Sequence, residues 1–366
     1  MKNYSSRLGK ITSPLRSGLR FSSKTFLFLA LPVFSGCSSV GYLLQAGKGQ
    51  LTLLNRAKPI SEVLKDERTP PKIKAILSEV DDIKKFGESQ LLKATKNYRD
   101  YVKVEGGAIS WVVSACDPLK FEPRRWSFPI VGSFTYLGWF SLDDAKEYAE
   151  EIKKEGLDVD VRGAAAYSTL GWFRDPVLST MVSRGDESLG DFVNIILHES
   201  VHATYYLDEQ SSFNESLASF VADQMTPQYL EQKKGKASPE LASYLAEEKQ
   251  SAQRQKLFHQ AYNELDELYK SSAPREEKLA KKADVLQRLM KATEAKREVN
   301  NATLIQFRTY GSGLAEFEKV YAACGRDWNR FWKAIRSVND KSFPSAQMEE
   351  IGPVVLKAAD ACALGS

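Results

Sequence analysis

The spacing of apolar residues changes character along the first half of the chain. Between residues 38 and 104, apolar positions recur every three or four residues, which predicts two or three helices. From 105 to 141, aromatic and β-branched residues broken by glycine and proline favour strands. A helical pattern over about 143–154 and a further extended stretch over about 159–170 follow. Together these stretches predict a small mixed sheet.

Helices dominate the pattern in the rest of the chain. One helical pattern covers residues 188–206, and a second covers about 212–224. Two long charged segments that begin near Pro239 and Pro274 predict a helical hairpin. The sequence therefore predicts an α+β fold that is mostly helical, with a small mixed sheet, two consecutive helices and a long charged helical hairpin.

The N-terminal segment has the order of a secretory signal. It contains six basic residues and no acidic one, and it ends in an apolar run from Thr25 to Phe34. That run is about half the length that a membrane-spanning helix needs. The small residues Ser35 and Gly36 directly before Cys37 resemble a bacterial lipobox, which predicts removal of residues 1–36 and attachment of lipid to Cys37. A plain signal peptide followed by a buried cysteine is the alternative.

Removal of this segment changes the charge balance of the protein. The remaining chain has 45 basic and 47 acidic residues, a net charge of −2, so we expect no nucleic-acid partner. An inner-membrane retention signal has aspartate at the position of Ser38. Because serine stands there instead, a periplasm-facing position on the outer membrane is favoured. The cysteines at 116, 324 and 362 lack the spacing of a metal site and allow one disulfide. The oligomeric state is left open.

The segment HESVH at 198–202 is the clearest chemical motif of the chain. On a helix, His198 and His202 share one face and can bind one metal ion, while Glu199 lies within reach of the attacking water. The apolar run before the motif would bury both imidazoles, and buried polar groups need partners. The motif predicts one Zn²⁺ ion with Glu199 as general base. The third histidine, His259, fits an ordinary surface position on a charged helix.

A catalytic zinc site has three protein ligands and one open position, and two residues compete for the third place. Asp208 stands where HExxHxxGxxH enzymes carry their last ligand, but Tyr205 replaces the glycine that turns the chain there. Glu215 is favoured because an antiparallel pair of helices would place it at a depth similar to that of His202. The alternative role for Glu215 is the last residue of a capping box that begins at Ser212.

Several segments carry a resemblance to a known family. The segment FNESLASFV at 213–221 is similar to the Asn-Glu-x-x-Ala helix that supplies the third zinc ligand in gluzincin aminopeptidases. With the lipobox, the chain resembles the bacterial family of predicted aminopeptidase lipoproteins from about Cys37 to Trp332. The other segments that carry this resemblance are 42–50, 126–132, 166–173 and 300–304.

This resemblance implies zinc-dependent hydrolysis of peptide bonds by an envelope aminopeptidase. The implied zincin-like domain covers 37–366, with N-terminal helices over 38–104, a sheet and active-site core over 105–226, and a helical part over 227–366. An endopeptidase is the first alternative, because no residue is identified that would capture a free amino terminus. A non-enzymic lipoprotein with a structural or decayed metal site is the second, and it would need a fourth ligand.

Two tyrosines and one short segment are candidates for further roles. Tyr310 and Tyr167 are candidate donors to the oxyanion that forms during hydrolysis, with a core position as the alternative. Ser168, Thr169 and Gly171 belong to a segment that we expect to line the cleft as an edge strand and to pair with the backbone of a peptide substrate.

Overall fold

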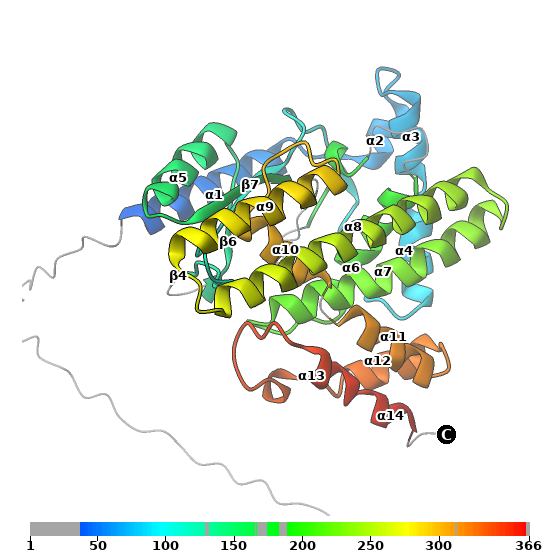
Figure 1. The fold of residues 1–366 in the computed structure, drawn as a ribbon. Coiled ribbons are helices and arrows are strands. Elements are labelled where there is room, and N and C mark those ends of the chain that lie inside the picture. The colour runs from blue at the N-terminus through cyan, green and yellow to red at the C-terminus, as the bar shows by residue number, and fades with distance from the viewer. Residues whose placement is uncertain are drawn as a thin grey trace, which may run out of the picture.

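The chain folds as an α+β protein in which helices predominate (Figure 1). This fold class agrees with the prediction from the hydrophobic pattern. In the part of the chain that is described, no helix is both long and apolar enough to cross a membrane. The computed structural model describes residues 37–128, 132–164, 166, 174–182, 189–311 and 313–363.

The N-terminal region contains more helices than the two or three predicted. Pro71 is the first residue of α3, and Glu79 alone separates α3 from α4, so one helical pattern becomes two helices. Two strands in this region are too short to show a periodic pattern. These elements are α1 (Cys37–Asn55), β1 (Lys58–Pro59), α2 (Ile60–Lys65), α3 (Pro71–Ser78), α4 (Val80–Ser89) and β2 (Asp100–Val102).

The main sheet has β3 (Ser110–Cys116) at its centre. Both β6 (Tyr136–Trp139) and β7 (Asp158–Ala164) pair with it in antiparallel orientation. Helix α5 (Leu142–Lys154) packs against this sheet, and apolar residues of β3 and α5 share one core. The hydroxyl of Ser141 accepts a hydrogen bond at the N-terminus of α5, which fixes the start of the helix that the sequence predicts.

The other strands form two smaller sheets. In one, β4 (Trp126–Phe128) pairs with β5 (Gly132–Phe134), and the hydroxyl oxygens of Ser127 and Ser133 lie 2.6 Å apart. In the other, β8 (Val177–Leu178) runs parallel to β2, and β2 is antiparallel to β1. The single mixed sheet expected from the sequence is therefore three sheets. Proline and glycine separate β4 and β5 from the main sheet, and the strands of the third sheet lie outside the predicted extended stretches.

Helices α6 (Leu189–Thr204) and α7 (Ser211–Lys234) form an antiparallel pair that also contacts α8 (Pro239–Lys270). A Cβ atom at Gly190 of α6 would lie 2.8 Å from the Tyr244 side chain of α8, so the close approach of these two helices needs glycine there. The predicted charged hairpin is confirmed. It consists of α8 and α9 (Arg275–Ala292), which lie side by side in Figure 1.

Helix α10 (Asn301–Gly311) connects the main sheet to α7. The backbone N–H of Asn301 donates to the Asp158 carboxylate at 2.9 Å, and the Asn301 side chain donates to the carbonyl of Asp117 at 2.9 Å. The Asn300 side chain donates to the carbonyl of Val159, also at 2.9 Å. These bonds attach the start of α10 to β7 and to the end of β3.

The C-terminal helices pack against α7 and are closed by a disulfide. Cys324 and Cys362 form this bond, whereas Cys116 is a buried free thiol, so the structure identifies the pair that the sequence left open. The helices are α11 (Leu314–Ala323), α12 (Trp328–Ile335), α13 (Gly352–Leu356) and α14 (Ala359–Ala363).

Candidate metal centre

The HESVH motif occupies the last turns of α6 as the sequence predicts. Residues earlier in this helix, among them Phe192, Val193 and Ile196, have no exposed surface. Their burial fixes the rotation of α6 about its axis, because a shift of one residue would expose this apolar face. The histidines at i and i+4 therefore face α7.

The turn between the two helices is held by Asn214. The buried Asn214 amide accepts a hydrogen bond from the N–H of Leu207 at 2.9 Å and donates one to the Leu207 carbonyl at 2.7 Å. Both polar groups of Leu207 are thus satisfied inside the protein. Because Glu215 follows Asn214 on α7, these two hydrogen bonds also set the position of Glu215 relative to the end of α6.

Glu215 lies next to both histidines. Its Oε2 atom is 3.4 Å from Nε2 of His198 and 3.8 Å from Nε2 of His202, and the two Nε2 atoms are 3.2 Å apart. Ligands at zinc bond lengths of about 2.0–2.2 Å around a tetrahedral ion are separated by roughly 3.4 Å. The three separations are close to this value, so the donor set of two imidazoles and one carboxylate fits a zinc ion.

The charges of the three groups are coupled. Burial raises the pKa of Glu215, but hydrogen bonds and charge attraction from His198 and His202 outweigh it and lower the pKa below its usual range. Burial lowers the pKa of His198, but Glu215, Glu199 and Asp223 outweigh it and raise the pKa. The carboxylate is therefore anionic and needs positive charge beside it, either a proton on an imidazole or a metal ion.

Glu199 differs from Glu215 in its surroundings. Burial is the main cause that raises its pKa, with a further contribution from the charges of Glu215 and Asp175, while His198 and His202 oppose it. Its Oε2 atom is shielded from solvent and has no hydrogen-bond partner among the described residues. A carboxylate with a raised pKa and a free oxygen suits a group that accepts a proton during a reaction.

Two residues near the centre were not identified from the sequence. Asp223, two turns after Glu215 on α7, accepts a 2.9 Å hydrogen bond from the Asn194 amide, and burial raises its pKa to about 6. Its charge favours the protonated form of His198. The ring of Tyr206 lies 6.0 Å from that of His202. Helical spacing from Glu215 and His202 is the signal that would have found both residues.

The structure favours neither Asp208 as the third ligand nor a capping-box role for Glu215. Asp208 is exposed in the turn between α6 and α7, and in the described residues the group that can hold a metal ion consists of His198, His202 and Glu215. Helix α7 begins after Gln210 without a side-chain cap, so the carboxylate of Glu215 faces the histidines instead of closing a capping box.

The other sequence candidates fall in different places. His259 is exposed on α8, as predicted. Tyr310 belongs to α10, but its side chain lies outside the described part of the structure. The candidates Tyr167, Ser168, Thr169 and Gly171 also lie outside the described residues.

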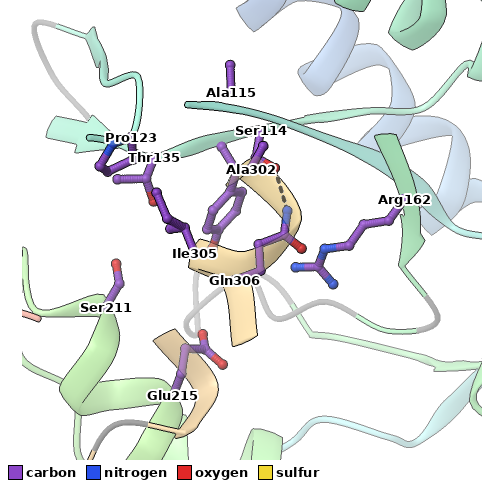
Figure 2. A pocket seen from close by; sticks show the side chains of 11 residues that line it. Ser114, Ala115, Pro123, Thr135, Arg162, Ser211, Glu215, Ala302, Ile305 and Gln306 are labelled. Atoms are coloured by element: carbon purple, nitrogen blue, oxygen red, sulfur yellow. Dashed lines mark hydrogen bonds between the residues drawn. The ribbon is translucent and has the colours of Figure 1, made fainter. Parts of the chain in front are cut away.

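Glu215 also lines a pocket that has residues of the sheet and of α10 on its other sides (Figure 2). The walls come from β3, β6, β7, α7 and α10, so the anchored start of α10 helps to shape the pocket. Figure 2 shows Arg162 reaching into this space from β7 and Gln306 donating a hydrogen bond to the hydroxyl of Ser114. Arg162, Gln306 and Ser114 could not be identified from the sequence, because they come together from distant segments.

Comparison with known proteins identifies one family. Residues 41–349 match the model of a family described as putative aminopeptidase. No curated protein matches the chain, and no solved structure does. The match includes the main sheet, helices α6 and α7, and the whole candidate metal centre.

The two candidate third ligands can be separated by substitution. We expect Glu215→Ala to abolish stoichiometric zinc binding, because it removes one of three ligands, whereas Asp208→Ala should leave it nearly intact. The measurement is metal content after dialysis against a weak chelator, with circular dichroism as a check on folding. Loss of zinc from Asp208→Ala with retention by Glu215→Ala would contradict this assignment.

Proposed function

The chain belongs to the putative aminopeptidase family, and from this premise we propose that it hydrolyses peptide bonds with one zinc ion held by His198, His202 and Glu215. The observation that carries the proposal is the spacing of the three donor atoms, which fits zinc bond lengths. Three protein ligands leave the fourth position open, as catalysis requires.

The reaction follows from the positions of the residues around this centre. When bound, the ion would supply Lewis acidity toward the scissile carbonyl and the attacking water. Glu199 accepts a proton from that water and donates it to the leaving amine. Its raised pKa lies closer to neutral pH, where one carboxyl group can both accept and donate a proton. Glu215 balances the charge at the centre, and Asp223 and Asn194 support the histidine side of the site.

The family match favours cleavage at the amino terminus of a peptide. A zinc peptidase of the gluzincin type is the finer assignment that we propose, because the HESVH helix is followed by a second helix that supplies a glutamate. An endopeptidase with the same centre would cleave peptides with blocked amino termini as readily as free ones, so this comparison separates the two activities.

We also propose that lipid on Cys37 anchors the protein in the bacterial envelope, facing the periplasm and favouring the outer membrane. The support comes from the basic and apolar segments before Cys37 and from the small residues at 35 and 36. The disulfide between Cys324 and Cys362 also supports this location, because disulfides persist in oxidising compartments.

Substitution of Glu199 separates catalysis from metal binding. We expect Glu199→Gln to keep one zinc per chain and to lose peptidase activity by roughly 100- to 10,000-fold, as removal of a general base does. The exposed residue Glu147 on α5 provides a matched control as Glu147→Gln, which should keep both properties. The experiment uses peptides with free and acetylated amino termini. Wild-type rates in Glu199→Gln would exclude the proposed role, and loss of zinc would make Glu199 a ligand.

The anchor is tested by Cys37→Ser. We expect this variant to leave the membrane fraction or to keep its N-terminal segment, because serine has no thiol to accept the lipid. The measurement is fractionation of cells followed by mass spectrometry of the N-terminus. Cys116→Ser is the matched control, since that thiol is buried in the fold. A Cys37→Ser protein that is processed and remains in the membrane fraction would contradict the anchor.

A further inference from the structure

Arg162 is the one cationic side chain among the residues that line the pocket beside Glu215. The pocket leaves about 30 Å³ of free space, roughly twice the 10–15 Å³ in which one water molecule fits. It therefore suits a small polar group with two oxygens, such as a carboxylate. Its lining residues are Ser114, Ala115, Pro123, Thr135, Tyr136, Arg162, Ser211, Glu215, Ala302, Ile305 and Gln306.

The position of Arg162 is fixed by the sheet. It pairs with Val112 in the antiparallel register of β7 and β3, and Figure 2 shows its side chain extending toward Gln306. On the opposite side of the view, the Glu215 carboxylate rises from α7 toward the same space. A guanidinium and the carboxylate of a candidate metal ligand thus face one pocket from different elements.

The charges around Arg162 favour an anion once a metal ion is bound beside Glu215. Asp160, on the same face of β7, is buried, and its ion pair with Arg297 offsets its negative charge. Glu215 lines the same pocket and balances the charge of Arg162. Gln306 donates from its Nε2 atom to the Ser114 hydroxyl and, at 3.4 Å, to the Asp160 carboxylate, and these bonds hold α10 against the sheet. A divalent ion beside Glu215 would add further positive charge, and the apolar walls at Ala302 and Ile305 lower the local dielectric.

We propose that Arg162 binds a carboxylate of the substrate close to the scissile bond. The chemistry is a planar guanidinium that donates two parallel hydrogen bonds to a carboxylate, in a pocket whose size admits that group. This inference rests on the proposed peptidase function and names its substrate class. Two sources fit the same chemistry: the free C-terminus of a short peptide, and an acidic side chain next to the scissile bond.

Four peptides distinguish the two sources. Alanyl-alanine against alanyl-alanine amide tests the C-terminal carboxylate, and alanyl-glutamic acid diamide against its monoamide with a free side-chain carboxylate tests the acidic residue. We expect the zinc-loaded wild type to prefer one carboxylate form. Arg162→Ala should lower kcat/KM for that form by roughly 30-fold or more and leave the amide form unchanged, because only the charged contact is lost.

Two control variants make the result specific. Arg162→Lys should restore part of the preference, because lysine keeps the charge but loses the bidentate geometry. Arg288→Ala removes an exposed arginine of α9, and it should behave as the wild type. Zinc content and circular dichroism show whether Arg162→Ala keeps its fold and its metal. If it does not, the inference is judged on Arg162→Lys alone, which must then lower the preference.

The outcomes that overturn the inference differ from those that overturn the proposed function. An equal loss on all four peptides would make Arg162 a donor to the reacting carbonyl, and an absence of carboxylate preference in the wild type would remove the site. If the wild type hydrolyses no peptide, the proposed function fails. Equilibrium binding of the same peptides to zinc-loaded Glu199→Gln then decides the inference: tighter binding of a carboxylate form, lost in Arg162→Ala, supports it, and equal binding overturns it.

Discussion

The antiparallel contact between α6 and α7 is the constraint on which the rest of the structure depends. It brings Glu215 within contact distance of His198 and His202, although the turn between the helices contributes no ligand. Asn214 fixes this turn through two hydrogen bonds with Leu207, and the buried face of α6 fixes the rotation of the helix. An anionic carboxylate in such a partly buried place costs free energy unless a cation lies beside it. The packing of α6 against α7 therefore places the Glu215 carboxylate where it needs a neighbouring cation.

The second part of the site depends on α10. Asn300 and Asn301 attach this helix to β7, so the sheet and α10 form one wall of the pocket and α7 forms the opposite wall. This arrangement explains why the segment 300–304, which is far from the HESVH motif, belongs to the same functional unit. The part that would perform chemistry lies on two helices, and the part that would hold the substrate lies on the sheet.

Local sequence patterns predicted the three candidate metal ligands, whereas the other features of the site depend on contacts between distant segments. The spacing within HESVH is a property of one helix, and the place of Glu215 follows from a short turn between two consecutive helices, so both could be predicted from the sequence. Arg162 could not, because its place in the pocket depends on the pairing of β7 with β3 and on the docking of α10. Asp223 lies two turns after Glu215, so helical spacing would have identified it, whereas its hydrogen bond with Asn194 depends on the packing of α6 against α7. The disulfide partner of Cys324 also depends on the path of the C-terminal helices.

The central claim is that two histidines and one glutamate hold a single zinc ion with one position open. X-ray absorption at the zinc edge of the purified protein tests it most directly, because this method reports the identity and distance of the coordinating atoms. The account predicts one zinc per chain, bound by nitrogen and oxygen at about 2.0–2.2 Å, with two imidazoles among the ligands. Sulfur at about 2.3 Å, a shell without imidazole scattering, or a protein that takes up no zinc would contradict it.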